Sequence, residues 1–180
     1  MADPKTFSPV KLICGIIVGE ESFFQIAEER LFHLFGTVDA ESPFFPFDLT
    51  DYYEKQMGVN LKRKFISFKK LIRPEKLSRI KLMTNKLEDG IRDELRAAHR
   101  AVNIDPGYLV SSALIMATAK NFAHRIPLQH GIYAHLEFLF GKDEVRPLFW
   151  TYPDYINKGC QNFFLEVRRI YLSQLKKKAG

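Results

Sequence analysis

Apolar residues in the first part of the chain form a continuous run and then a helical repeat. VKLICGIIV (10–18) is an almost unbroken series of β-branched and other apolar residues, which is typical of a strand buried on both faces. After Gly19 the apolar spacing changes to three or four residues, which predicts an amphipathic helix that ends at Gly36. Ser22 and Gln25 have the spacing of a capping box at the start of this helix. Its apolar stripe consists of Phe23, Ala27, Leu31 and Leu34.

The middle of the chain repeats this order of strand and helix. RKFISFKKLI (63–72) predicts a second strand, and Pro74 stands at a favoured first position for a long helix. RAVNI (100–104) predicts a third strand, and the Asp105-Pro106-Gly107 sequence after it has the composition of a turn. LVSSALIMATA (109–119) fits strand or helix by periodicity, and the strand-rich context favours a strand. The stripe of the long helix consists of Leu77, Ile80, Thr84, Leu87, Ile91 and Leu95.

Alternating apolar and polar residues predict a β-hairpin over residues 124–140. If residues 129–130 form a two-residue loop, His124 lies directly opposite His135, and Tyr133 lies on the same face. Opposed side chains in such a pair have Cβ atoms ~5 Å apart. The two imidazoles would then be close enough to share a metal, a phosphate or a proton. The alternative is that both histidines lie on a solvated face.

The order of these elements predicts one domain, residues 1–180, of the α+β class. Residues 144–150 add an edge strand with an internal proline, and Pro153 begins a final helix. The early strands are joined by helices, which favours parallel or crossover pairing, whereas the later hairpin is antiparallel. We therefore expect a mixed sheet with helices packed on it, and a ferredoxin-like topology is the best match.

Composition and charge narrow the class of protein without selecting a function. The chain is 46% hydrophobic and 27% charged, with 16 Phe and a formal net charge of +6. We find no secretory signal and no apolar run long enough to span a membrane. The two cysteines fall in a predicted strand and a predicted helix, which favours buried thiols in a reducing cytoplasm. The basic balance favours a phosphate-bearing partner, although lysines at a helix end also serve solubility.

Two segments resemble nucleotide-binding motifs, and both fail in context. The VGEES turn (18–22) follows the first strand, where a phosphate-binding loop would lie, but it has two acids and no lysine. Those acids would repel a pyrophosphate from the helix N-terminus. NKLE (85–88) resembles the guanine-binding motif of GTPases, with Glu in place of Asp. It falls inside the predicted long helix, whereas the motif requires a loop after a strand.

A polar group before the hairpin is the most general candidate for a binding site. Lys120, Asn121, His124 and Arg125 bring cationic and polar groups together, which suits a phosphate or carboxylate ligand. A salt-bridge network explains the same residues equally well. Asp105 ends a predicted strand, where a carboxylate serves catalysis or metal binding, or accepts backbone N–H groups in an Asx-turn.

The segment FFPFDLTDYYEKQMG (44–58) combines aromatic rings with carboxylates. Asp51 and Glu54 have the spacing of a capping box for a short helix that ends at Gly58. The phenylalanines before them predict core packing of an irregular loop. Asp48 then remains as an acid between rings with no local structural role.

Several stretches of the chain resemble an uncharacterised bacterial and archaeal domain-of-unknown-function family of about this length. The stretches are SPFFPFDLTDYYEKQMG, FISFKKLIRPEKLSRIKLMTNKLE, VNIDPGYL, KNFAHRIPL, GIYA and FWTYPDY. Members of this family are often labelled GTP-binding proteins. The resemblance implies no established activity or catalytic residue, and an acid often follows GIYA where this chain has His135. It points to Asp48, Tyr52, Tyr53, Glu54, Asp105, His124, Arg125, Tyr133 and Tyr152.

Three functions are compatible with these observations. The leading one is a cytoplasmic protein whose polar pocket binds an anionic, phosphate-bearing ligand; whether it also acts on that ligand stays open. The candidate catalytic residues are Asp48, Asp105 and His124, and the candidate ligand-binding residues are Lys120, Arg125, Tyr52, Tyr133 and His135. No metal or cofactor is assigned. The alternatives are an RNA- or nucleotide-associated module with exposed rings as stacking platforms, and a structural or interaction protein.

Overall fold

The computed structural model describes residues 3–50 and 53–179. Its helices are α1 (Glu21–Phe35), α2 (Glu54–Met57), α3 (Leu77–Glu94) and α4 (Lys158–Ala179), with short 3-10 segments η1 (Pro74–Lys76) and η2 (Pro153–Ile156). Its strands are β1 (Lys11–Val18), β2 (Val38–Glu41), β3 (Phe45–Pro46), β4 (Lys62–Phe68), β5 (Val102–Leu109), β6 (Ala113–Thr118), β7 (Ile126–Pro127), β8 (Tyr133–Phe140) and β9 (Val145–Pro147). The predicted α+β class is confirmed.

The described strands form one sheet in the order β2-β4-β1-β5-β6-β8-β7, with β3 beside β4 and β9 beside β8. Every described pairing is antiparallel, including those that join β1 to β4 and β5. Neighbouring strands are therefore antiparallel where a mixed sheet was expected. The expected ferredoxin-like topology is present, because β1-α1-β2 and β4-α3-β5 form two split βαβ units in the order β2-β4-β1-β5. Helices α1 and α3 each join two strands of the same direction, β1 to β2 and β4 to β5, and one other strand lies between the members of each pair.

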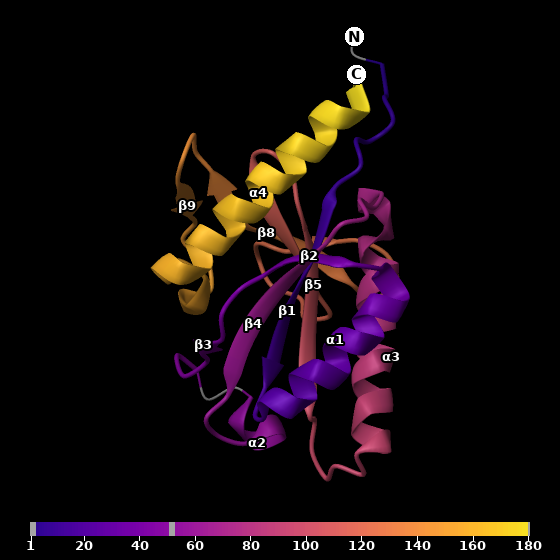
Figure 1. Cartoon of the computed structure of the whole chain (residues 1–180), viewed down its shortest axis with the longest axis vertical. Helices are drawn as coiled ribbons and strands as arrows, with labels where there is room; N and C mark the ends of the chain where they lie inside the picture. Colours follow the sequence, from indigo (N-terminus) through magenta and orange to yellow (C-terminus); the bar gives the residue numbers. More distant parts are fainter. Residues whose placement is uncertain (1–2, 51–52, 180) are drawn as a thin grey trace.

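Helices cover both faces of the sheet (Figure 1). Leu12, Cys14 and Ile16 of β1 face one side and form a core with residues of α1 and α3. Ile13 faces the opposite side and belongs to a second, aromatic-rich core with Phe164 of α4. All residues of β1 are buried, as its sequence predicted. The α4 core covers only part of its face, and the rest of that face is available for a site.

The sheet splits between β5 and β6. Among the described residues, these strands pair only where Gly107–Leu109 meets Leu114–Met116, and no described strand pairs with the first half of β5 on that side. The predicted turn at Asp105-Pro106-Gly107 is wrong, because these residues lie within β5. Pro106 has no backbone N–H. Its nitrogen points in the same direction as that of Ile104, away from β1, so the missing donor faces the side that β6 does not reach.

The predicted hairpin is present with a different register. The pairs are Ile126 with Ala134 and Pro127 with Tyr133, so the loop has three residues instead of two. Its His130 and Gly131 have φ angles of 59° and 72°, the left-handed conformation that closes the turn. This shift removes the directly opposed pairing of His124 and His135. The two rings nevertheless lie in contact, as described below.

Several local predictions at helix ends can be compared with the structure. Helices α1 and α2 end at Gly36 and Gly58 as predicted, and both glycines have positive φ. The capping box of α1 is wrong, because Glu20 is the N-cap and Ser22 donates to the Glu20 carboxylate. Asp51, the predicted cap of α2, lies outside the described residues. In the part of the chain described, no helix has the length and apolar character needed to cross a membrane.

Candidate functional site

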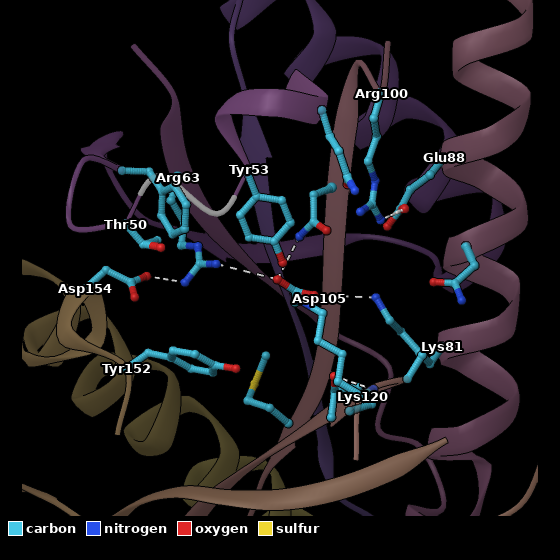
Figure 2. A pocket seen from close by; sticks show the side chains of 18 of the residues that line it. Thr50, Tyr53, Arg63, Lys81, Glu88, Arg100, Asp105, Lys120, Tyr152 and Asp154 are labelled. Atoms are coloured by element: carbon cyan, nitrogen blue, oxygen red, sulfur yellow. Dashed lines mark hydrogen bonds and ion pairs between the residues drawn. The ribbon is translucent and has the colours of Figure 1, made fainter. Parts of the chain in front are cut away.

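A cavity of about 1030 Å³ opens at the split between β5 and β6 (Figure 2). Residues of β4, β5 and β8 form its floor, α3 forms one wall, and the segments around α2, after β6 and at η2 form its rim. Its charged described lining residues are the cations Lys55, Arg63, Lys81, Arg92, Arg100, Lys120 and Arg125 and the acids Glu88, Asp89, Asp105, Glu137 and Asp154. The cavity is therefore polar, with more basic than acidic side chains.

Asp105 lies at the centre of the cavity (Figure 2). Its carboxylate accepts a hydrogen bond from Asn103 Nδ2 at 2.8 Å and has Lys81 Nζ at 3.4 Å and Arg63 at 3.5 Å. Burial alone would raise the pKa of Asp105, but Lys81, Arg63 and the Asn103 hydrogen bond outweigh it and lower this pKa below its ordinary value. Asp105 is therefore ionised at neutral pH, where it accepts hydrogen bonds and cannot act as an acid.

Arg63 of β4 links two carboxylates across the cavity floor. It forms an ion pair with Asp154 of η2, and its guanidinium also reaches Asp105. The guanidinium lies 4.6 Å from the ring centre of Phe47 and 5.4 Å from that of Tyr155, at cation–π distance. The Arg63 side chain is only 6% exposed. A cation this deeply buried requires both acids, so β4, β5 and η2 are tied together at this point.

Side chains of α3 replace the strand that is missing beside β5. Ile104 N–H donates to Glu88 Oε1 at 2.6 Å, and Ile104 C=O accepts from Lys81 Nζ at 2.6 Å. The other Glu88 oxygen accepts from Arg100. Burial raises the pKa of Glu88 even though Lys81 and Arg100 act in the opposite direction. The N–H and C=O of Ile104, which β6 does not reach, are thus satisfied by α3, and this stabilises the split beside the cavity.

The cationic group predicted before the hairpin forms part of the rim. Arg125 Nη1 donates to the Lys120 carbonyl oxygen and Nη2 donates to Tyr152 Oη, each at 2.8 Å. Lys120 Nζ lies 5.4 Å from the ring centre of Tyr53. Asn121 also lines the cavity. These contacts fix the Arg125 guanidinium at the cavity edge, next to an aromatic hydroxyl.

A buried pair on β8 completes the cavity wall. His135 Nε2 lies 2.6 Å from Glu137 Oε2, and Glu137 Oε1 accepts the Tyr152 N–H at 2.8 Å. The ring of His124 stacks on Trp150 and meets that of His135 edge-on, with centroids 5.1 and 5.7 Å apart. Partial burial lowers the pKa of His124, and His135 and Arg125 act in the same direction. His124 is therefore neutral near pH 7.

Three buried side-chain polar atoms have no hydrogen-bond partner among the described residues: Arg63 Nε, Arg125 Nε and His135 Nδ1. All three belong to residues that line this one cavity. Buried donors and acceptors are almost always paired in folded proteins, because leaving one unmade costs about 1–3 kcal/mol. Their concentration at a single place distinguishes this cavity from the rest of the fold.

The structure brings together only some of the residues predicted from sequence. Asp105, Lys120, Arg125 and His135 line the cavity, whereas His124 and Tyr133 do not. His124 still contacts the His135 ring from outside. Asp48 is an exposed residue that does not line the cavity, although its neighbours Phe47 and Leu49 do. Tyr52 lies outside the described residues.

Tyr53 and Tyr152, to which the family resemblance pointed, also line the cavity. The structure adds further lining residues that the sequence did not indicate, principally Arg63, Lys81, Glu88, Arg100, Asn103, Glu137 and Asp154. Arg63 falls at the start of the strand predicted over 63–72 and was not a candidate for the site. The alternation of β4 was the missed signal, since Arg63 shares a face with the buried Phe65 and Ser67.

The phenylalanine rings of segment 44–58, candidates for the stacking platforms of the RNA-binding alternative, are packed instead. Phe44 meets Phe24 edge-on at 5.4 Å, Phe45 contacts the Phe65 ring at 6.4 Å, and Phe47 is 7% exposed. Because these rings are packed, they expose little apolar surface for a protein–protein interface. The basic residues Lys62 and Lys64 pair with Glu21 and Glu41. These contacts do not favour the RNA-binding or interaction alternatives.

Metal and thiol chemistry gain no support from the described part of the chain. Within it, no group of three or more His, Cys, Asp or Glu side chains is placed to hold a metal ion. Cys14 and Cys160 are buried and unbridged, and burial raises the pKa of both thiols. A thiol that resists ionisation is a poor nucleophile.

The fold and the cavity together define a small α+β protein with a polar cavity in a split antiparallel sheet. The chain belongs to the family described as Domain of unknown function (DUF4416), which matches residues 8–171. The resemblance to an uncharacterised domain-of-unknown-function family is thereby confirmed. Neither a curated protein nor a solved structure matches the chain significantly.

Proposed function

We propose that the cavity at the β5–β6 split binds an anionic, phosphate-bearing small molecule. The observation that carries this proposal is the pair of unpartnered guanidinium N–H groups, Arg63 Nε and Arg125 Nε, on the same cavity. Guanidinium groups form charge-assisted hydrogen bonds with phosphate and carboxylate oxygens, and these bonds are about twice as strong as neutral ones. A bound oxyanion satisfies donors that the protein itself leaves unmade.

The charge of the cavity supports the same ligand class. Seven described lysine and arginine side chains line it, against five carboxylates. Part of this charge is neutralised inside the protein, because Arg63 pairs with Asp154 and Arg100 with Glu88. The remaining positive charge lies at the rim and attracts an anion toward the floor. A volume of about 1030 Å³ is large enough for a phosphorylated metabolite.

Replacing Arg125 tests this proposal. Inorganic phosphate and phenyl phosphate are expected to bind the wild type and raise its melting temperature, with an affinity that falls as salt is added. Arg125→Met removes one of the two free guanidinium donors and the charge beside it, so we expect binding about tenfold weaker or more. Isothermal titration calorimetry at low ionic strength measures both affinities.

Arg146→Met is the matched control for this experiment. Arg146 lies on β9, is 65% exposed, pairs with Glu144 and does not line the cavity. Arg146→Met removes one positive charge, as Arg125→Met does, so a general electrostatic effect would weaken binding equally in both variants. Equal affinities in the two variants, or no phosphate binding by the wild type at low salt, would contradict the proposed site.

A further inference from the structure

The cavity offers acceptors as well as donors, and this restricts the ligand beyond its charge. Glu137 is fully buried, and one of its oxygens already accepts the Tyr152 N–H. We assign the proton in its 2.6 Å contact with His135 to Nε2, because a carboxylate oxygen accepts hydrogen bonds. This tautomer places a lone pair on Nδ1. It is buried, and it has no donor among the described residues.

Asp105 is a second acceptor on the same surface. Its pKa is lowered mainly because Lys81 and Arg63 outweigh the effect of burial, so the carboxylate is ionised at neutral pH. The Asn103 amide donates to one acceptor position of the Asp105 carboxylate, and the Asp105 side chain is 23% exposed. The Asp105 carboxylate can therefore accept a further hydrogen bond from a ligand in the cavity.

Each acceptor lies near one of the two arginines that carry an unpartnered Nε among the described residues. Arg63 lies 3.5 Å from Asp105. Arg125 donates to the Tyr152 hydroxyl, and the Tyr152 ring centre lies 6.0 Å from that of His135. Met116 of β6 pairs with both Gly107 of β5 and His135 of β8, so His135 lies two strands, or ~10 Å, from Gly107. Asp105, Arg63, Arg125 and His135 all line the same cavity, so one extended ligand has all four residues within the same space.

These placements rest on the proposed phosphate site and identify its ligand more closely. We propose that the ligand is a phosphate ester with free hydroxyl groups, a phosphorylated polyol or sugar, whose hydroxyls donate to His135 Nδ1 and Asp105 while its phosphate accepts from Arg63 and Arg125. Inorganic phosphate satisfies only the donors. A hydroxyl-free alkyl phosphate leaves both acceptors unpaired in a desolvated cavity. Unpaired buried polar groups weaken ligand binding strongly.

Two ligands that differ only in their hydroxyls test the inference. Glycerol 3-phosphate and n-propyl phosphate have the same carbon chain and the same phosphate. Calorimetry on the wild type is expected to give at least about tenfold tighter binding of glycerol 3-phosphate. In His135→Phe, which keeps a ring of similar size without its nitrogens, the preference is expected to fall below about threefold, with n-propyl phosphate bound as before.

His33→Phe is the matched control, because His33 is an exposed residue of α1 that does not line the cavity. It is expected to keep the full preference. An independent measurement covers the case in which His135→Phe fails to fold. Imidazole ¹⁵N NMR of the wild type is expected to show a protonated Nε2 and an unprotonated Nδ1, and addition of glycerol 3-phosphate is expected to shift the Nδ1 resonance.

The outcomes separate this inference from the proposed function. Equal affinity for the two esters overturns the hydroxyl-bearing ligand and leaves the phosphate site intact, and so does a ring protonated at Nδ1. Binding of none of the phosphates, with inorganic phosphate included, overturns both. A preference that persists in His135→Phe and disappears in His33→Phe overturns the role of His135.

Discussion

Arg63→Met is expected to destabilise the protein by about 3–5 kcal/mol, the range found when one partner of a buried ion pair is removed. Arg63 is the cation between Asp105 and Asp154, and both acids lie at the cavity floor. Methionine fills a similar volume but leaves two carboxylates close together in a partly desolvated site. Urea denaturation, monitored by circular dichroism, measures the loss as the difference in the free energy of unfolding.

The loss should depend on pH in a specific direction. Arg63 lowers the pKa of both Asp105 and Asp154, so its removal raises both folded-state pKa values. A carboxyl with a raised pKa in the folded state is destabilising once the pH rises above that pKa, and this penalty disappears when the group is protonated. The difference between wild type and Arg63→Met is therefore expected to be largest near pH 7 and to narrow toward pH 4.

A charge-balancing variant and a surface variant complete this experiment. Arg63→Met combined with Asp154→Asn removes one of the two unpaired acids, and we expect it to recover part of the lost stability. Arg92→Met removes an arginine that is 43% exposed and pairs with Asp89 and Asp93, so the cost should be under about 1 kcal/mol. A cost for Arg63→Met as small as that of Arg92→Met would contradict its buried role.

The parts of the fold that sequence predicted well depend on local periodicity. The continuous apolar run at 10–18 indicated a doubly covered strand, and β1 is buried along its whole length. The spacing of Leu77, Ile80, Thr84, Leu87 and Ile91 indicated one buried helix face, and all five side chains are buried in α3. In both cases the burial pattern follows from neighbours in sequence, so no knowledge of the partner element was needed.

The incorrect predictions share a dependence on distant partners. Asp105, Pro106 and Gly107 have turn propensities, but β1 pairs with this segment along its length, and the split beside β5 accommodates the proline. The mixed sheet was wrong because α1 and α3 connect strands that have the same direction but are not neighbours: β4 lies between β1 and β2, and β1 lies between β4 and β5. Helical connections alone do not determine which strands pair.

The candidate site was predicted in part for the same reason. Lys120 and Arg125 were selected because they cluster in sequence near the hairpin. Arg63 and Asp154 are separated by 91 residues, and no local pattern indicates that they meet. Glu88 and Lys81 lie on one face of α3, but their roles depend on the unpaired backbone of β5. Charged residues at core-facing positions of a strand or helix were the available signal.

Gly107→Ala is expected to destabilise the protein by about 3 kcal/mol, at the upper end of overpacking costs. Gly107 lies in β5 at the last pairing before the split, opposite Met116. A Cβ atom there would lie 2.5 Å from the Ile115 carbonyl oxygen and 3.2 Å from Met116 Cα, with the Met116 sulfur also in its path. Because two of these contacts are with backbone, β6 must move away from β5, and side-chain rotation alone cannot relieve the strain.

Gly90→Ala, within α3, is the contrasting glycine variant. A Cβ atom there has nothing within 4 Å, so alanine should stabilise the helix by up to about 1 kcal/mol. Opposite signs of the change in unfolding free energy for the two variants are therefore expected. In Gly107→Ala the displaced β6 also moves Lys120 and the pairing with His135, so phosphate binding should weaken along with stability. A Gly107→Ala variant as stable as the wild type, with normal phosphate binding, would contradict the close contact of β5 and β6 at Gly107. It would also contradict the role of the split in forming the cavity.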